Sequence, residues 1–174
     1  MIGKELEHTK TLTAETDGVA AIVIDANVAH LHLVSGQNSQ LRAVVTLSSR
    51  DEARLEHCAK GEFRAQREGE TLRLAMSQPA PGQRCGERWS VVIPRGLAIS
   101  ATTEVGDIQA SLAGDYGNIA LETAVGSASL EVDGRRVSAT KPNPTSESIR
   151  EQGVGATVVL RSNVGDVRAV ITTH

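Results

Sequence analysis

Two histidines on one predicted strand are the side chains in this sequence best placed to bind a metal ion. His30 and His32 flank Leu31, and side chains two residues apart on a strand point to the same face, so the two imidazoles can share one ion. His57 and Cys58 offer further nitrogen and sulfur ligands. A structural zinc site normally needs four ligands, and no spacing here assembles four, so we expect neither a metal site nor a cofactor. A solvated strand face explains the histidine pair equally well.

Motifs for catalysis are missing from the sequence. It contains no Gly-x-Ser-x-Gly elbow of serine hydrolases, no His-Glu-x-x-His pair of zinc peptidases and no phosphate-binding loop. The Gly-Asp pairs at Gly106 and Gly165 do not repeat with the nonapeptide spacing of calcium-binding β-rolls. We therefore predict that the protein is not an enzyme and has no catalytic residues.

Composition and charge narrow the class of protein further. The 174 residues carry a formal net charge of −3, so we expect no nucleic-acid partner. Only 2% of the residues are aromatic, namely Phe63, Trp89 and Tyr116, whereas grooves for sugars or single strands usually rely on aromatic faces. The core must therefore be built from Val, Leu, Ile and Ala, which suits thin stacked β layers.

Alternation of apolar and polar residues with a period of two dominates the sequence and predicts β-strands. Residues 20–33 and 41–47 follow this pattern. A later strand places Trp89, Val91 and Ile93 on one face. Because Trp89 is in register with two aliphatic residues, we expect its side chain to be mostly buried.

One short helix and several β-hairpins are expected in residues 1–94. Ser49 followed three residues later by Glu52 has the pattern of a capping box at a helix start, and Gly61 would end the helix. Residues 63–76 contain two alternating runs around a glycine-containing turn, which is typical of a hairpin.

Residues 95–174 repeat a short unit in which a strand is followed by a glycine corner. Glycine supplies the positive φ that a tight corner requires, and units this short must stack to bury a face. The sequence therefore predicts a single all-β domain over residues 1–174, a stacked β-solenoid or β-helix-like rack, with a loop insertion at residues 140–152. The predicted structural corners are Gly106, Gly117, Gly126, Gly134 and Gly165.

The chain carries the segments "WSVVIP", "LAISATTEVGDIQASLAGDYGNIALETAVGSASLEV" and "GATVVLRSNVGDVRAVI". In these it resembles the toast-rack, or putative-adhesin, family of bacterial cell-envelope domains, over roughly residues 20–171. The resemblance implies an all-β stack, an extracytoplasmic setting and a scaffold or interaction role without established catalytic residues. The sequence departs from the family pattern at Gly126-Ser127, where Gly-Asp is more typical.

Cys58 and Cys85 lie near the two ends of the predicted hairpin. In the oxidising compartment that the resemblance implies, their natural state is a disulfide bond. It would close a loop of 28 residues and stabilise the fold by ~3–4 kcal/mol. Two free thiols in a cytosolic protein are the alternative.

The expected function is a non-enzymatic, adhesin-like interaction or scaffold module of the cell envelope, periplasmic or secreted. Its partner would be an envelope protein or surface component, and strand edges would allow self-association. Residues 1–13 lack the apolar region of a secretory signal, so a cytoplasmic protein is the alternative. The alternative function is binding of a glycan or small molecule, or a degenerate glycan-cleaving β-helix. Trp89 exposed beside clustered carboxylates would favour that alternative.

Overall fold

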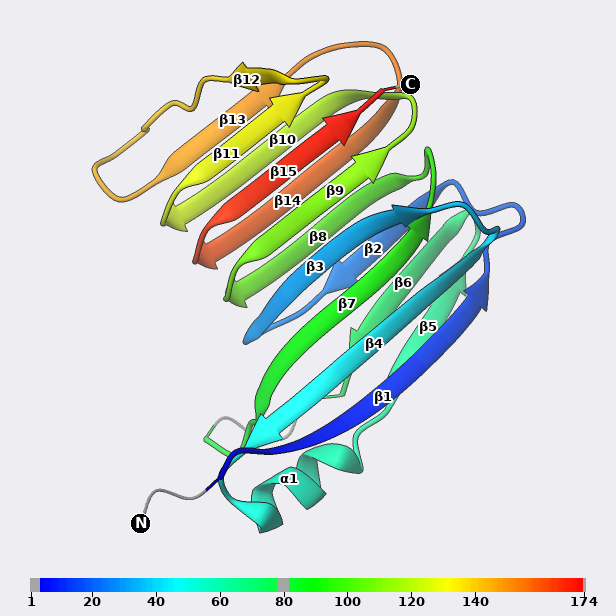
Figure 1. Ribbon diagram of the computed structural model, residues 1–174, viewed down its shortest axis with the longest axis vertical. Helices are drawn as coiled ribbons and strands as arrows, with labels where there is room; N and C mark the ends of the chain where they lie inside the picture. The colour runs from blue at the N-terminus through cyan, green and yellow to red at the C-terminus, as the bar shows by residue number, and fades with distance from the viewer. Residues whose placement is uncertain (1–3, 78–81, 174) are drawn as a thin grey trace.

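The computed structural model describes residues 4–77 and 82–173 and consists of two stacked β-sheets and one short helix (Figure 1). The prediction of an all-β fold is confirmed. Sheet A contains, in spatial order, β1 (Leu6–Glu15), β4 (Gln40–Ser49), β7 (Gly86–Pro94), β3 (Ala29–Gly36), β9 (Ile108–Ala113), β15 (Val167–Thr172), β11 (Ala128–Val132) and β12 (Arg135–Val137). Sheet B contains, in spatial order, β13 (Glu147–Glu151), β10 (Tyr116–Val125), β14 (Ala156–Val164), β8 (Ala98–Val105), β2 (Ala21–Asp25), β6 (Thr71–Met76) and β5 (Phe63–Glu68).

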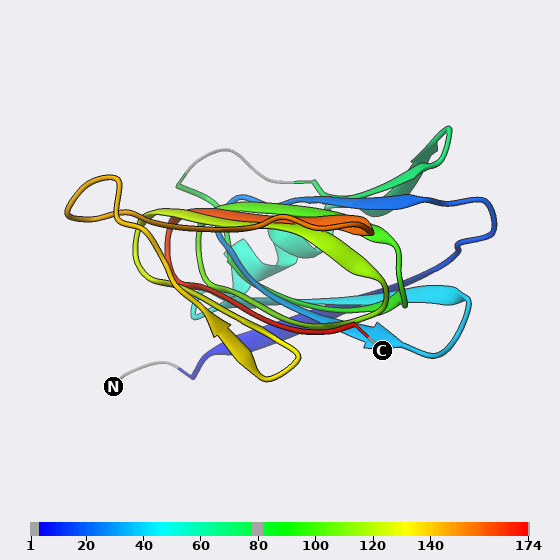
Figure 2. The same ribbon diagram turned by 90° about the horizontal axis from the view of Figure 1, so that it is seen from above.

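The core is the thin layer between the two sheets, which Figure 2 shows edge-on. Each strand sends alternate side chains into this layer, and most of them are Val, Leu, Ile or Ala. Trp89 is completely buried, as its register predicts, and its ring meets that of Phe63 edge-to-face with centroids 5.1 Å apart.

Four pairs of consecutive strands cross from sheet B to sheet A through a corner of two or three residues, and we call each pair a rung; β6 and β7 make the same crossing through a longer segment. In spatial order the rungs are β2–β3, β8–β9, β14–β15 and β10–β11. Neighbouring rungs are parallel in both sheets. The last rung in the chain, β14–β15, therefore lies between two earlier ones, whereas a solenoid wound in chain order would place it at the end of the stack.

Residues 1–94 contain fewer hairpins than the sequence predicts. β5 and β6 form an antiparallel hairpin around Gly69. β3 and β4 follow each other in the chain, yet both pair with β7 rather than with each other, and β3 is parallel to β7. The parallel pairing of the rungs thus extends into the first half of the chain, and the antiparallel pairs β1–β4 and β4–β7 close the end of sheet A.

Helix α1 (Glu52–Ala59) covers the end of the stack beside β4 and β1, with Leu55 and Cys58 buried (Figure 1). The expected capping box is wrong in its first residue, because the N-cap is Asp51, whose carboxylate accepts hydrogen bonds from the amides of Ala53 and Arg54. Ser49 instead accepts a hydrogen bond from the Asp51 amide. No helix in the described ranges has both the length and the apolar character needed to cross a membrane.

The sequence predicts a loop over residues 140–152, but only part of this segment is a loop. Its second part forms β13, which pairs antiparallel with β10, and Thr140 bridges back to Ser148. β10 pairs with the rung strand β14 along one edge. β13 pairs with the other edge of β10 and satisfies the backbone hydrogen-bonding groups there.

Candidate functional site

Three rungs turn from sheet B to sheet A through the same short sequence, Ser/Thr-x-Val-Gly. It occurs at residues 103–106, 123–126 and 162–165. The fourth rung turns at residues 27–29, where Ala29 takes the place of the glycine. The four turns lie side by side, and we call this border of the molecule the corner edge.

The first residue of each motif points inward and satisfies a carbonyl group of the neighbouring rung. At a corner the chain leaves its sheet, so this carbonyl has no strand partner and needs another donor. All three hydroxyl-bearing residues are buried. The bonds run from Ser162 Oγ to Gly106 O (2.7 Å), from Thr123 Oγ1 to Gly165 O (2.6 Å) and from Thr103 Oγ1 to Ala29 O (3.1 Å), and the Thr103 hydroxyl also lies 2.8 Å from Asn27 O.

Glycine is required at the end of each motif for two reasons: its φ is positive, and a carbonyl group of the neighbouring rung occupies the place of a Cβ. Gly106, Gly126 and Gly165 have φ between +144° and +148°. A Cβ on Gly106 would lie 1.8 Å from the carbonyl oxygen of Ala29, and one on Gly165 would lie 2.1 Å from that of Gly106. The rungs therefore stack so closely at the corner edge that no side chain fits between them.

A third set of contacts lies on the outer side of the same corners, where each rung caps a backbone amide of the next. The residue after the glycine donates its N–H to a side chain of the preceding rung. Ser127 belongs to the outermost rung, and no parallel rung follows it in the stack, so a carboxylate there would have no corner amide to accept from. This explains why Ser127 replaces the usual aspartate. The bonds run from Asp107 N to His30 Nδ1 (3.1 Å), from Asp166 N to Asp107 Oδ1 (2.8 Å) and from Ser127 N to Asp166 Oδ1 (2.9 Å).

His30 thus belongs to the corner edge, as an acceptor rather than as a metal ligand. Its Nδ1 also lies 3.9 Å from the Asp107 carboxylate, but the shorter contact with the amide requires an unprotonated Nδ1. His32 is exposed on the outer face of β3. Within residues 4–77 and 82–173, no three His, Cys, Asp or Glu side chains gather closely enough to hold a metal ion.

Two of the predicted corner glycines have other roles. Gly117 lies inside β10, where a Cβ would come within 2.3 Å of the Val154 backbone, and the corner glycine of this turn is Gly114, with φ +142°. Gly134 belongs to a two-residue hairpin turn with Asp133 that joins β11 to β12, with φ values of +81° and +49°. Asp-Gly favours such a turn because both of its central residues need positive φ.

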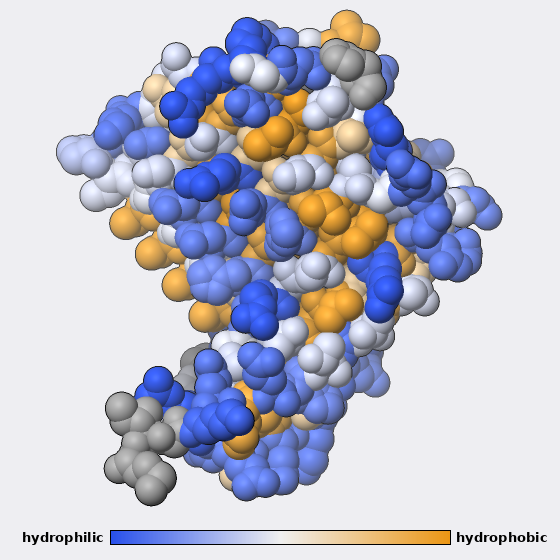
Figure 3. All heavy atoms as spheres, in the orientation of Figure 1, coloured by the Kyte–Doolittle hydropathy of each residue, from blue (hydrophilic) through white to orange (hydrophobic). Residues whose placement is uncertain are grey.

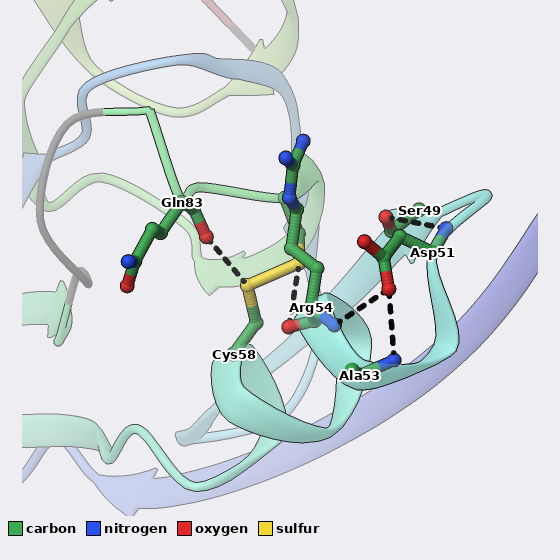
Figure 4. The surroundings of a disulfide bond; sticks show 7 residues. Ser49, Asp51, Ala53, Arg54, Cys58 and Gln83 are labelled. Carbon is green, nitrogen blue, oxygen red and sulfur yellow. Dashed lines mark hydrogen bonds between the residues drawn. A yellow bond between two sulfur atoms is a disulfide. The ribbon is translucent and has the colours of Figure 1, made fainter.

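Cys58 and Cys85 form a disulfide bond that ties helix α1 to the start of β7 (Figure 4). Both residues are buried. The bond holds the helix over the open end of the core, where Asp51 caps its first turn.

Glu87 is an ionisable side chain inside the core that the sequence analysis did not select. Its Oε1 accepts a 2.8 Å hydrogen bond from Trp89 Nε1. Burial raises the pKa of this carboxyl above its ordinary value of 4.5, while the Trp89 hydrogen bond and the charge of Arg84 oppose the rise. Its signal in the sequence is its position two residues before Trp89, in register with the inward face. Tyr116 is also buried, which raises its pKa to about 12, and its hydroxyl donates to Leu97 O at 2.9 Å.

The outer face of sheet B carries a polar hollow of about 610 Å³ over β8, β14, β10 and β13. At its centre Glu122 forms ion pairs with Arg150 and Arg161, each at 3.1 Å. Pro142 and Ser146 form one wall, and the buried Ser146 Oγ has no hydrogen-bond partner among the described residues. Thr102 and Ser148 are the less buried hydroxyl-bearing residues of the lining, whereas Thr103, Thr123 and Ser162 are buried and bonded to the corner carbonyls.

Comparison with solved structures finds matches at low sequence identity, all with TM-scores below 0.5. A putative cell adhesion protein from Clostridium sporogenes aligns over 97% of this chain and 100% of its own, with 11% identity and a TM-score of 0.44. A putative adhesin from Parabacteroides distasonis aligns over 97% of this chain and 57% of its own, with 14% identity and a TM-score of 0.40. A putative adhesin from Parabacteroides merdae aligns over 65% of this chain and 42% of its own, with 14% identity and a TM-score of 0.39. No protein-family model and no curated protein matches the chain.

Proposed function

We propose that this chain is a non-enzymatic, adhesin-like interaction module of the cell envelope, in which a single rack-like domain presents a rigid, regularly spaced surface. The observation that carries the proposal is the corner edge. Hydroxyl, glycine and carboxylate contacts repeat there between successive rungs, so the edge is fixed from inside and outside. A surface ordered before binding loses little conformational entropy when a partner docks.

The disulfide bond supports a location outside the reducing cytoplasm. Disulfides persist in oxidising compartments such as the periplasm or the extracellular space, and Cys58–Cys85 joins two segments distant in sequence. In that setting the bond keeps helix α1 over the end of the core. A periplasmic or secreted protein is therefore the location that we propose.

The partner that we propose is an envelope protein or surface component. Besides the corner edge, the outermost strands of the two sheets, β1, β12, β13 and β5, offer backbone groups for strand addition or self-association. β1 is the longest of these, and it alternates exposed and half-buried residues over most of its length.

The test is crosslinking in the native cells, followed by fractionation and mass spectrometry of the attached molecules. A photoreactive residue at an exposed outer position, such as Glu131 on β11, captures a molecule that docks beside it. Reproducible crosslinks to one envelope component support the proposal. Recovery in the cytoplasmic fraction without any attached partner would refute it.

The polar hollow on sheet B favours a second candidate function, binding of a glycan. Its Glu122–Arg150–Arg161 cluster, with the hydroxyl groups of Thr102 and Ser148, matches the hydrogen-bonding needs of a sugar. Burial of Trp89 removes one aromatic platform from any such site. Saturation-transfer NMR with envelope oligosaccharides, repeated with Arg161→Ala, tests this candidate, and equal signals from both proteins would remove it.

A further inference from the structure

Four valines stand in a row on the outside of the corner edge, and we call them the valine ladder. Val125 is the cross-strand neighbour of Val164, Val164 of Val105, and Val105 of Val28. Each is between 41% and 48% exposed, which is unusual for aliphatic side chains that are mutual neighbours. Figure 3 shows apolar side chains stepping down the left edge of the molecule, at the strand ends where Figure 1 places the corners.

Carboxylates flank this ladder on both sides. Glu104 precedes Val105 on the sheet B side, and Asp107 and Asp166 follow the corner glycines on the sheet A side. All three are exposed, and in the described part of the chain no lysine or arginine forms an ion pair with them. The nearby Arg161 is held by Glu122. The ladder is therefore an apolar ridge with a negative border.

A hollow of about 260 Å³ opens beside one end of the ridge. Val28, Val105 and Val164 form its apolar wall, and Asp107 contributes a carboxylate to its lining. A lysine or arginine side chain suits this combination, because its aliphatic stem can pack on valine while its charged group reaches a carboxylate.

We propose that the valine ladder is the docking site for an amphipathic α-helix of a partner protein whose apolar stripe is bordered by lysine or arginine. This inference rests on the proposed function as an interaction module and names its surface. One basic side chain of the helix enters the hollow beside Val28, and the others face Glu104 and Asp166.

The spacing of the ladder favours a helix over an extended peptide. Neighbouring strands lie about 4.8 Å apart, so the four valines span roughly 14 Å. The apolar stripe of a helix repeats about every 5.3 Å, since 3.5 residues rise 1.5 Å each, and drifts only about 1.5 Å over three steps. Side chains on one face of an extended peptide recur about every 6.7 Å and lose register after one step.

Charge and area argue against two other occupants. A second copy of the chain has the same repeat, but it would bring Asp107 and Asp166 against their like-charged counterparts. Four half-exposed valines also provide far less than the roughly 800 Å² per partner of a stable dimer. Anionic lipid headgroups would be repelled by the same carboxylates.

The experiment titrates the ¹⁵N-labelled full chain with a capped three-heptad helical peptide that has Leu at positions a and d and Lys at e and g. We expect amide shift changes concentrated at Gly106, Gly126 and Gly165, with a dissociation constant on the order of 10⁻⁴ M. The double variant Val105→Thr/Val164→Thr keeps the β-branched shape and should weaken binding at least fivefold. Val170→Thr, 40% exposed on the outer face of sheet A, is the matched control and should leave binding unchanged.

The opposite results overturn the inference. They are shift changes spread away from the corners, equal binding of the same peptide with Glu in place of Lys, or no binding at 2 mM peptide. Two further results would assign the valine ladder to another occupant. They are self-association of the chain without peptide and binding of anionic phosphatidylglycerol vesicles, provided that Val105→Thr/Val164→Thr abolishes the effect. If the peptide fails while crosslinks in cells persist, only this assignment falls and the interaction function stands.

Discussion

The hydroxyl of Thr123 donates a 2.6 Å hydrogen bond to the carbonyl oxygen of Gly165, a residue of the neighbouring rung that lies 42 positions away in the chain. The same carbonyl oxygen lies 2.1 Å from the site where a Cβ on Gly126 would stand. The rung β10–β11 therefore provides a hydrogen-bond donor for the Gly165 carbonyl oxygen and, at Gly126, the space that this oxygen occupies. This pairing of Thr123 with Gly126 links a local sequence motif to the stacking of distant segments.

Replacing Thr123 by valine removes the donor but keeps the shape of the side chain. The carbonyl of Gly165 then stays buried without its partner, so we expect the free energy of unfolding to fall by about 1–3 kcal/mol. Urea denaturation followed by circular dichroism measures the change. Thr102→Val, at an exposed position of strand β8 in the same sheet, is the matched control and should change stability by less than about 0.5 kcal/mol. Equal effects of both substitutions would contradict the role of the Thr123 hydroxyl.

Two glycines with positive φ should respond very differently to alanine. Gly165 has φ +148° and no room for a Cβ, so Gly165→Ala should cost about 3 kcal/mol or more, up to complete loss of folded protein. Gly69 has φ +63° in the β5–β6 turn with no atom near its Cβ site, so Gly69→Ala should cost about 1–2 kcal/mol. Thermal unfolding of both variants checks the order, and a Gly165→Ala protein as stable as Gly69→Ala would refute the close stacking of the rungs.

Opening the Cys58–Cys85 disulfide should lower the free energy of unfolding by about 2–4 kcal/mol, because the unfolded chain regains the freedom of a closed loop. Unfolding of the native protein with and without dithiothreitol measures this difference. The double variant Cys58→Ala/Cys85→Ala should be destabilised to a similar degree and should not respond to the reductant. Alkylation of both thiols in unreduced protein from the native host would argue against the bond and against the proposed compartment.

The strands and the composition of the core could be predicted from the sequence because they depend on local alternation. Trp89 illustrates this, since its register with Val91 and Ile93 is enough to place it inside. The helix was predicted, but its N-cap was assigned to Ser49 from the three-residue spacing to Glu52. In the structure the N-cap is Asp51, whose carboxylate accepts the first amides of the helix without a capping box. Local rules therefore recovered the elements better than their boundaries.

The partners of each strand could not be predicted from local patterns. Gly106 and Gly117 look like equivalent corners in the sequence, yet Gly117 lies within a strand and is a glycine because the Val154 backbone approaches it. The rung β14–β15 lies between β8–β9 and β10–β11 because β14, which follows residues 140–152 in the chain, pairs with both β8 and β10. The motif Ser/Thr-x-Val-Gly, present three times, was a signal for the corner edge and for the exposed valines, and only the parallel register brings its copies together.

The last prediction concerns the pH dependence that the buried carboxyl of Glu87 gives the fold. Its pKa in the native state is raised above the ordinary value of 4.5, mainly by burial. The native protein therefore holds this proton more tightly than the unfolded chain does, and protonation of Glu87 stabilises the fold. The stabilisation is fully present below pH 4.5 and is lost as the pH rises through the native pKa.

Glu87→Gln separates this effect from the rest of the titration, because glutamine still offers Oε1 to the Trp89 indole but carries no charge. We expect the variant to gain stability relative to the native protein as the pH rises from 4 to 8, since only the native protein must bury a carboxylate at the higher pH. Urea denaturation at four or five pH values measures the difference, and Glu68→Gln, at an exposed strand end, controls for the loss of one negative charge. If the difference between the variant and the native protein grew instead as the pH fell, the Trp89 and Arg84 interactions would outweigh burial, and the carboxylate would be the stabilising form.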